Sequence, residues 1–372
     1  MHLGMSLGVS RGNVPFALSQ LFAAGQKGGL WLPNDPLTGF QESTGVTAGA
    51  VNLPTGLRLD KRLGLVLGSE LLESSSPSGT GWTDAVATPA NTVSGDLLTF
   101  GGQYSGRINA ATTEANKTYE FKFTARRISG NTALHIFYEN SASGTGLTAF
   151  TISGTAAQYT VRVLGKAGGG IVNFGIQDRN AAGHGQIEIN AFSVKLLDGN
   201  HVLQSTAAAR PTWKLDGAIY SDLFDGTDDG YATAAFAAGT LTSDMDCFIA
   251  VKRNSAADVV LCSKDGNYYF GFASSGGVGA PQALSGTPSY LVDGAAITAT
   301  NGALHTALTV GAWHILEVRN LDLSAWTAFR LSLYAGYFLN GNIGGVILRE
   351  VMSTAERNSA RTALGSLVGL SL

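Results

Sequence analysis

A chain of 372 residues is too long for one ordinary hydrophobic core, and its length predicts two or three domains. Glycine accounts for 49 residues, nearly twice its usual share of roughly 7%, while charged residues make up 14% and hydrophobic residues 44%; this excludes a disordered chain and indicates a folded, turn-rich β protein. The net charge of −3, with no run of basic residues, argues against nucleic acid as the main partner.

Residues 1–30 are small, apolar and rich in glycine, and we expect them to form an arm that docks on another subunit. A helix over Val14–Ala24 would place Leu18, Leu21 and Phe22 on one face, which is too little for a core. Packing of this segment on its own chain is the alternative. Because no Lys or Arg precedes the first apolar stretch, a signal peptide is not expected. No apolar run approaches the roughly 18 residues of a membrane span.

The next segment, residues 31–66, begins with Trp31-Leu-Pro-Asn-Asp-Pro36 and passes through Gly56-Leu-Arg-Leu-Asp-Lys61. Prolines at positions 33, 36 and 54 forbid a long helix, because proline lacks the backbone N–H and clashes with the preceding turn.

Residues 67–198 are predicted to form a separate domain. Short segments alternate apolar and polar residues with period two, as in Tyr119-Glu-Phe-Lys-Phe-Thr-Ala125, and Gly, Ser, Asn and Thr fill the gaps between them. Seven or eight short strands at such spacing predict a β-sandwich. The expected strands are Leu97–Phe100, Thr118–Arg127, Ala133–Tyr138, Thr148–Ile152, Gln158–Leu164, Ile171–Gln177 and Gln186–Leu196.

Residues 199–372 are expected to carry a second set of strands. Residues 311–319 alternate cleanly, with Trp313, Ile315 and Glu317 on one face of the strand. The expected strands are Ala218–Phe224, Cys247–Lys252, Val259–Ser263, Tyr268–Ala273, Ser289–Val292, Trp313–Asn320, Leu331–Tyr337 and Gly344–Arg349.

The chain is predicted to end with a helix, because Ser353-Thr-Ala-Glu356 is a capping box. Its apolar stripe consists of Ala360, Ala363, Leu364 and Leu367. Upstream, Cys247 and Cys262 lie on neighbouring predicted strands. They are expected to be small buried core residues, with a disulfide across a hairpin as the alternative.

One acidic turn is the candidate metal site. An apolar strand end runs into Asp225-Gly226, where glycine permits a sharp turn, and Asp228 and Asp229 follow. Three carboxylates within five residues offer the hard oxygen ligands that Ca²⁺ prefers. The alternative is a turn whose Asp side chains accept hydrogen bonds from nearby backbone N–H groups.

The stretch from Gly199-Asn-His201 through Ala209-Arg-Pro211 to Phe224-Asp-Gly226 and Tyr231 resembles, in order and spacing, laminin-G/concanavalin-like jelly rolls of tailed-phage virion proteins. In simpler members of that family an Asp-Lys pair runs almost directly into Gly-Asn-His. Here about 137 residues separate Lys61 from Gly199, which implies that a domain has been inserted into the jelly roll. Leu323-Ser-Ala-Trp326 and the terminal helix are also similar to that family, and its laminin-G-like members sometimes bind Ca²⁺.

The insert in turn resembles carbohydrate-binding-module-like jelly rolls of the galactose-binding type. The resemblance is carried by Ser69-Glu-Leu-Leu72 with Gly81-Trp82, by Lys117-Thr-Tyr-Glu-Phe121, and by the closing segment Gln186–Lys195. Members of this family often hold a structural Ca²⁺ between an early Glu and an Asp on the last strand. Here Glu70 or Glu73 would be the first ligand, but Asn190 stands at the last-strand position, which puts that ion in doubt.

Sugar binding needs an exposed aromatic plate and planar polar side chains that read hydroxyl groups. The candidates in the insert are Trp82, Tyr104, Arg107, Tyr138, Asn140, Gln177, Asp178 and Arg179, against the alternative that the aromatic residues belong to the core. Carboxylates suited to glycoside hydrolysis are present at Glu139, Asp178 and Glu188, but their separation cannot be read from the sequence. The serine-hydrolase-like Gly4-Met-Ser-Leu-Gly8 has no strand before it. We therefore expect no enzyme activity and no catalytic residues.

Together these features predict an all-β protein with two antiparallel β-sandwich (jelly-roll) domains, one inserted in the other. The units are a docking arm (1–30), a first sandwich segment (31–66), the inserted jelly roll (67–198), and the main sandwich with its C-terminal helix (199–372). The family resemblance implies a structural subunit of a phage tail fibre or tail appendage, on the exterior of the virion and assembled in the host cytoplasm.

The expected partners follow from that assignment. They are further copies of the chain in a homo-oligomer such as a trimer, other tail proteins bound through residues 1–30, and host surface polysaccharide. Neither nucleic acid nor membrane insertion is expected, and Ca²⁺ is the one candidate cofactor. The alternatives left open are a capsid decoration or head-fibre protein, a polysaccharide depolymerase of the tail, and a secreted bacterial lectin.

Overall fold

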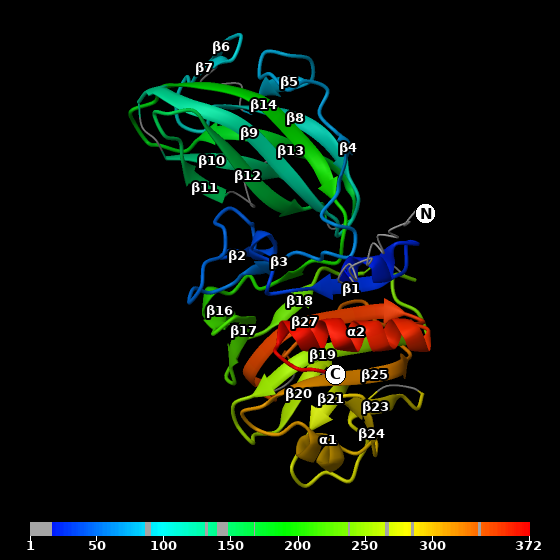
Figure 1. Cartoon of the computed structure of the whole chain (residues 1–372). Helices are drawn as coiled ribbons and strands as arrows, with labels where there is room; N and C mark the ends of the chain where they lie inside the picture. The colour runs from blue at the N-terminus through cyan, green and yellow to red at the C-terminus, as the bar shows by residue number, and fades with distance from the viewer. Residues whose placement is uncertain are drawn as a thin grey trace, which may run out of the picture.

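The computed structural model describes residues 17–85, 91–130, 133–139, 148–166, 168–236, 239–264, 268–283, 286–333 and 336–372; along 133–139 and 148–150 the description covers the backbone. Its antiparallel strands form two β-sandwiches, one above the other in Figure 1. The predicted all-β fold class with a C-terminal helix is confirmed. Neither α-helix of the described part has the length and hydropathy of a membrane span.

The upper sandwich consists of residues 67–197, in the sheets β11-β10-β13-β8-β5 and β12-β9-β14-β7-β6, with β4 beside β14. Phe121, Phe123, Phe174 and Phe192 pack between the sheets. Its strands are β4 (Leu67–Glu70), β5 (Trp82–Asp84), β6 (Thr92–Ser94), β7 (Leu97–Thr99), β8 (Gly106–Thr113), β9 (Thr118–Ser129), β10 (Ala133–Glu139), β11 (Thr148–Thr151), β12 (Ala157–Leu164), β13 (Gly170–Asp178) and β14 (Gln186–Leu197). We call this unit the inserted sandwich.

The lower unit, the main sandwich, stacks the sheet β16-β17-β27-β19-β25-β23-β24 on the sheet β2-β3-β15-β18-β26-β20-β21-β22, with β1 beside β27. Its strands are β1 (Gly28–Trp31), β2 (Gly39–Phe40), β3 (Leu57–Arg58), β15 (Val202–Leu203), β16 (Thr212–Asp216), β17 (Ile219–Asp225), β18 (Tyr231–Thr233), β19 (Met245–Arg253), β20 (Val259–Ser263), β21 (Tyr269–Ala273), β22 (Gln282–Ala283), β23 (Ser289–Val292), β24 (Ala295–Ile297), β25 (Trp313–Leu321), β26 (Arg330–Leu331) and β27 (Asn340–Glu350). The helices are α1 (Asn301–Ala307) and α2 (Thr354–Leu367), with short 3₁₀ turns η1 (Leu18–Phe22), η2 (Pro36–Thr38) and η3 (Ala207–Ala209).

Chain segments from both sides of the insert share the sheets of the main sandwich. Val202 of β15 pairs with Arg58 of β3, and Trp31 of β1 pairs with Val346 of β27. Within the insert, Leu67 at its start pairs with Leu197 at its end. The chain therefore leaves and re-enters the main sandwich at one point. In such an arrangement the insertion of a whole domain costs little loop-closure entropy.

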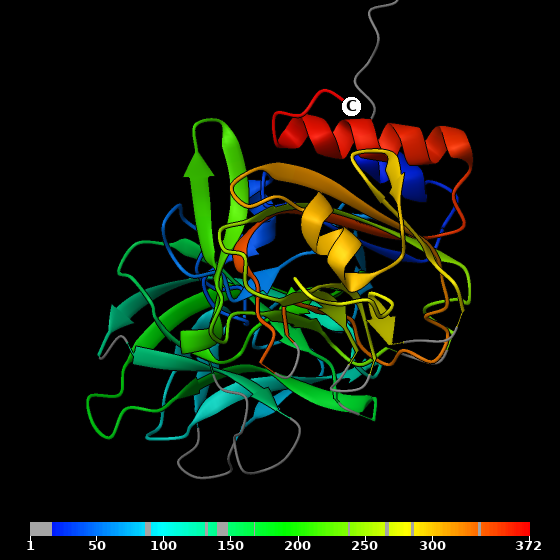
Figure 2. The same ribbon diagram turned by 90° about the horizontal axis from the view of Figure 1, so that it is seen from below.

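Helix α2 forms a third layer on the outer face of the sheet that holds β19, β25 and β27 (Figure 2). Its predicted capping box is present, since the Ser353 hydroxyl accepts from the Glu356 N–H and the Glu356 carboxylate accepts from the Ser353 N–H. Hydrogen bonds from the Ser353 N–H and from Arg349 lower the pKa of Glu356 to about 2. The predicted stripe packs on the sheet, and Gly345 of β27 lacks a Cβ where Leu364 approaches.

The start of the described chain packs on this same layer. Leu18, Leu21 and Phe22 are buried with Leu364 and Val368. The predicted helix over Val14–Ala24 is only the short η1 turn in the described residues. Leu18, Leu21, Phe22 and Leu30 thus pack on their own chain, the alternative left open for this segment, and docking of residues 1–30 on another subunit stays a prediction. Residues 1–16 lie outside the described residues, and their docking stays a prediction.

Three local details differ from the sequence-based expectation. The strand expected over Leu331–Tyr337 stops at Leu331, because Ser332 has a left-handed φ of 56°. Helix α1 was not expected; Thr300 caps it by accepting from the Ala303 N–H at 3.2 Å. Cys247 and Cys262 are free and buried, as expected, but they lie in β19 and β20 of facing sheets and are not partners across a hairpin.

A buried carboxylate holds the junction between the sandwiches. Asp60 is 0% exposed, and it accepts hydrogen bonds from the backbone N–H groups of Leu30 (2.9 Å) and Asn200 (2.7 Å) and from Arg62 Nε (2.9 Å). In return, the Asp60 N–H donates to His201 Nδ1 at 2.9 Å. Burial lowers the pKa of His201, which keeps the ring neutral and its Nδ1 able to accept. The Asp-Lys and Gly-Asn-His motifs thus meet in space.

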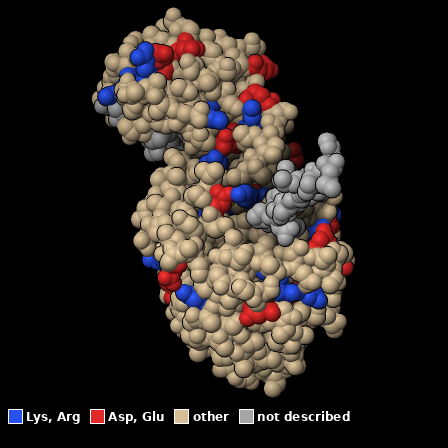
Figure 3. Space-filling model, viewed as in Figure 1, with Lys and Arg blue, Asp and Glu red and all other residues tan. Residues whose placement is uncertain are grey.

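A second contact braces the inserted sandwich. Arg162 of β12 donates to Gly45 O at 3.0 Å and to Glu120 Oε2 at 2.8 Å, and its guanidinium lies 4.4 Å from the centre of the Phe40 ring. A groove of about 480 Å³ lies beside this contact. Charged side chains are otherwise scattered in small groups over the face shown in Figure 3.

Candidate carbohydrate-binding site

The candidate site lies where β13 ends and the turn before β8 begins. Gly106 pairs with Gln177 across these strands, which brings Tyr104 beside the end of β13. The Tyr104 N–H donates to Asp178 O at 2.6 Å, and Gln177 Nε2 donates to Tyr104 O at 2.7 Å. Tyr104 has a left-handed φ of 66°, which a tightly bonded turn can hold. Sequence positions more than 70 residues apart therefore form one local structure.

The Tyr104 side chain is the exposed aromatic group of this site, at 46% of its full accessible surface. The Arg179 guanidinium lies 4.7 Å from the centre of its ring, and Arg179 Nη1 donates to Gln177 Oε1 at 3.0 Å. The arginine is therefore held in place by one aromatic and one amide contact. An exposed ring beside a planar donor is an arrangement that can stack on a sugar ring and bind its hydroxyl groups. Gln177, predicted as a ligand, is 3% exposed and positions Arg179 instead.

Asp178 supports this surface from below and does not face solvent. It is 1% exposed; its Oδ1 accepts from the Asn180 N–H at 2.8 Å, and its Oδ2 contacts His184 Nδ1 at 2.8 Å. Its predicted role as a sugar ligand is therefore corrected to one of positioning. Asn180 and His184 were not predicted, although a polar loop directly after a strand was a usable signal.

Two further candidates belong to the scaffold. Trp82 is 6% exposed, lies 4.3 Å from Phe192 between ring centres, and donates from Nε1 to Ser74 O at 2.9 Å. Arg107 donates to the carbonyl oxygens of Pro77 and Trp82, both at 2.9 Å, and pairs with Asp84 at 3.2 Å. The predicted roles of Trp82 and Arg107 in sugar binding are corrected: one fills the core and the other fastens a loop.

The remaining candidates are placed only in part. The backbone of Tyr138 pairs with Phe174, whereas Gln177 pairs with His135 further along β10. The Tyr138 side chain and Asn140 lie outside the described residues, and so does the serine-hydrolase-like segment at residues 4–8.

The candidate catalytic carboxylates are separated by the fold. Asp178 ends β13 in one sheet, and Glu188 lies on β14 in the other, paired at the surface with Arg126 at 2.5 Å. The Glu139 side chain lies outside the described residues.

The three carboxylates of the candidate metal site do come together. One oxygen from each of Asp225, Asp228 and Asp229 lies within 4.8 Å of the others. Local hydrogen bonds also occupy them, since Asp225 Oδ1 accepts from the Thr227 N–H at 2.7 Å and Asp229 Oδ2 from the Asp225 N–H at 3.0 Å. Burial and the neighbouring Asp225 raise the pKa of Asp229 to about 6. Such a turn offers oxygen ligands for Ca²⁺, which stays a prediction.

The insert's second candidate calcium position is built differently. Both Glu70 oxygens are engaged, Oε1 by the Val194 N–H at 2.7 Å and Oε2 by Ser193 Oγ at 2.6 Å, and Asn190 donates to Asp96 at 3.1 Å. Glu70 and Asn190 thus have protein partners, and a Ca²⁺ ion at this position stays a prediction.

No family model and no curated protein matches this sequence. Among solved structures, it is similar to the CBM22-1–CBM22-2 tandem domain of Paenibacillus barcinonensis Xyn10C, at 12% identity and a TM-score of 0.30, over 76% of this chain and 98% of that one. The CBM22-1 xylan-binding domain alone gives 13% identity and a TM-score of 0.27, over 36% of this chain and 97% of the domain.

A phage protein is also among these structures. The enzymatically active domain of bacteriophage CBA120 tailspike protein 4 is 14% identical, with a TM-score of 0.26, over 34% of this chain. The match spans about a fifth of that chain's length, 21%. These distant similarities concern the β-sandwich fold only. By fold, the described chain consists of two antiparallel β-sandwiches.

Proposed function

We propose that this chain is a structural subunit of a tailed-phage appendage, such as a tail fibre, whose inserted sandwich binds host surface glycans. It would stand on the exterior of the virion after assembly in the host cytoplasm, without enzyme activity of its own. The support is the resemblance of the Gly199–Tyr231 region to phage jelly rolls, together with the Tyr104 surface.

The observation that carries the glycan-binding proposal is the arrangement at the end of β13. The half-exposed Tyr104 ring lies beside Arg179, which Gln177 orients at 3.0 Å. A pyranose would lay its C–H face on the ring, and Arg179, held in place by the buried Gln177, would bind its hydroxyl groups. One such contact is weak, and a trimer would multiply it by holding several copies on one cell surface.

The junction supports a projecting, stiff part. Arg162 of the inserted sandwich reaches Gly45 O and the Phe40 ring of the preceding segment, and Asp60 joins the chain segments at the point where the insert leaves and returns, so these contacts favour a fixed direction of the glycan surface relative to the main sandwich. Residues 1–30 would attach the subunit to other tail proteins.

A glycan array with the full chain tests the proposal. Binding to bacterial surface polysaccharides is expected for the wild type and is expected to be lost in Tyr104→Ala. Tyr268→Ala is the matched control, because that ring is 43% exposed and also carries a cation, Lys264, at 4.8 Å, but lies in the main sandwich. No binding by the wild type, or equal loss in both variants, would contradict the site.

Two further measurements test the proposed absence of enzyme activity and the proposed position on the virion. Incubation with the bound polysaccharide is expected to release no reducing ends; release would make the chain a depolymerase. A reconstruction of the virion is expected to show the chain on the tail, and density at the capsid would favour the head-fibre alternative.

A further inference from the structure

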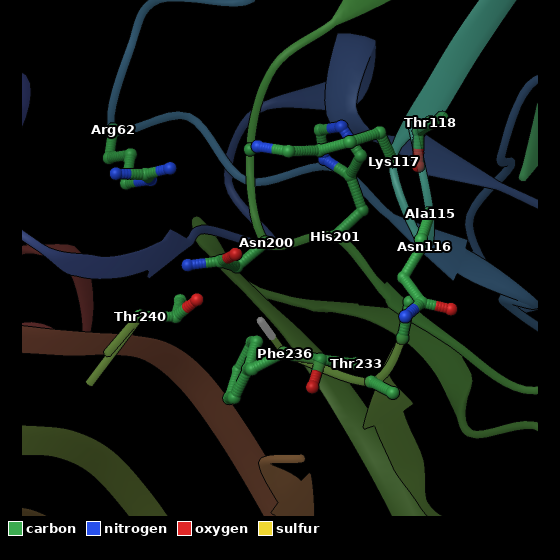
Figure 4. A pocket seen from close by; sticks show the side chains of 13 residues that line it. Arg62, Ala115, Asn116, Lys117, Thr118, Asn200, His201, Thr233, Phe236 and Thr240 are labelled. Carbon is green, nitrogen blue, oxygen red and sulfur yellow. The ribbon is translucent and has the colours of Figure 1, made fainter. Parts of the chain in front are cut away.

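A small pocket opens at the junction of the two sandwiches, away from the Tyr104 surface. It is lined by the turn before β9 (residues 115–118), by Arg62, by Asn200 and His201 of the returning chain, and by Thr233 and Phe236 of the main sandwich. Figure 4 shows the side chains of Arg62 and Lys117 extending toward one another from opposite sides, with Asn200 between them.

The pocket is lined by basic side chains and by no acidic ones among the described residues. Arg62 and Lys117 line it, but their acidic partners Asp60 and Asp198 do not, and none of its described lining residues is acidic. Arg62 donates to Asp60 through its backbone N–H and its Nε, and its two terminal amino groups have no hydrogen-bond partner among the described residues. His201 is neutral because its Nδ1 accepts from the Asp60 N–H. Two cations therefore line the pocket while their acidic partners lie outside its wall.

The ion pair between Lys117 and Asp198 is weak, so a bound anion can displace Asp198 from Lys117. Their atoms are 3.3 Å apart, and the side chains are 38% and 41% exposed. An exposed pair of this kind contributes little, because water and salt screen it. Arg62, by contrast, is held by the fully buried Asp60, so its guanidinium group is already oriented in the absence of a ligand.

The size and the polar groups of the pocket limit what it can take. Its volume is about 100 Å³, below the roughly 300–1,000 Å³ of pockets that enclose whole small-molecule ligands. Asn116, Asn200 and Thr233 also line the pocket, and Phe236 forms part of its wall. A pocket of this size and polarity suits a single oxyanion group, with the rest of the ligand molecule outside the pocket.

We propose that this pocket binds the acid group of a charged sugar, a carboxylate or a phosphate, between the Arg62 guanidinium and the Lys117 ammonium. Charge-assisted hydrogen bonds from both cations would hold the oxyanion, and the hydroxyl and amide groups would contact the adjoining ring. The sugar part of this statement rests on the proposed glycan-binding function; the oxyanion part rests on the pocket alone. Acidic surface polysaccharides are then the preferred class of ligand.

Titration calorimetry of the full chain at low ionic strength tests the pocket with three probes: inorganic phosphate, methyl glucuronide and neutral methyl glucoside. At least one acid probe is expected to bind and the glucoside not, and which of the two binds identifies the carrier. Lys117→Gln is expected to weaken binding about tenfold or more, since a hydrogen bond to a charged group contributes about 1.5–3 kcal/mol. Lys117→Arg should retain it.

Lys122→Gln is the matched control, because that lysine also has an acidic neighbour, Glu120 at 3.8 Å, but lies outside the pocket. The proposal is overturned if neither acid probe binds at about 10 mM, if the glucoside binds equally well, or if Lys117→Gln binds like the wild type. Phosphate binding without glycan-array binding would leave the pocket standing and remove the glycan function. If the chain binds glycans on the array through Tyr104 but binds neither acid probe, the glycan-binding function stands and the pocket proposal is overturned.

Discussion

The two sandwiches bury their sheets in different ways. In the inserted sandwich, strands such as β12 and β14 alternate between buried and more accessible positions, because each sheet has one face on the core and one toward solvent. In the main sandwich, β19 and β27 are buried along almost their whole length, since α2 and η1 cover their outer face.

The covered strands of the main sandwich also hold fully buried ion pairs. Strands with two covered faces still carry Asp246 and Glu317, both 0% exposed, and arginines of α2 neutralise them: Arg357 contacts Asp246 at 2.8 Å and Arg361 contacts Glu317 at 2.9 Å. The inserted sandwich keeps a comparable pair, Arg126–Glu188, at its surface. The third layer thus makes the main sandwich depend on buried ion pairs.

The largest expected effect separates the two cores. Phe121→Ala removes a ring that packs on Phe123, Phe174 and Phe192, and we expect a loss of about 3–5 kcal/mol in the unfolding free energy of the inserted sandwich. Scanning calorimetry should show one transition lowered and another unchanged. Leu316→Ala in the main core is the control and should shift the other transition; a single transition that both variants shift equally would mean that the sandwiches unfold together.

Removal of a buried charge should come next in size. Glu317→Ala leaves Arg319 and Arg361 without their buried carboxylate, and a loss of about 3 kcal/mol is expected in chemical denaturation. Glu188→Ala breaks the exposed pair with Arg126 and should cost about 0–1 kcal/mol. Similar losses in the two variants would contradict the contrast between the sandwiches.

The acidic turn predicts a pH dependence of intermediate size. Because the pKa of Asp229 is raised from 3.8 to about 6, the folded protein binds more protons than the unfolded chain between these values. The unfolding free energy should therefore fall as the pH rises from about 4 to about 6, by up to about 2 kcal/mol from this group. Asp229→Asn should flatten that part of the profile. If Ca²⁺ binds the turn, it should raise the melting temperature of the wild type at pH 7 but not that of Asp229→Asn.

The helix cap gives the smallest effect. Ser353→Ala removes the hydroxyl that accepts from the Glu356 N–H, and about 1 kcal/mol should be lost at neutral pH. Since the pKa of Glu356 is lowered from 4.5 to about 2, the carboxylate half of the box contributes above pH 4.5 and is lost as the pH falls toward 2. Ser366→Ala, near the other end of α2, is the control and should change little.

Part of the candidate site was predictable from sequence. Polar residues at a strand end, such as Gln177 and Arg179, stand out because the strand itself alternates. Trp82 was ambiguous, since a ring after glycine looks the same in sequence whether it is exposed or buried; its contact with Phe192, 110 positions away, decides. The pairing of Gly106 with Gln177 was likewise invisible, and it alone brings Tyr104 to Arg179.

The sequence by itself determined the all-β class, most strand positions, and the capped terminal helix, because period-two patterns and capping chemistry act over a few residues. Only the tertiary structure decided which surfaces meet: η1 on α2, Asp60 on three chain segments, and two cations around one pocket. Those contacts join residues that are far apart in the chain. They depend on strand pairing and on the packing of layers, and no local sequence pattern specifies either.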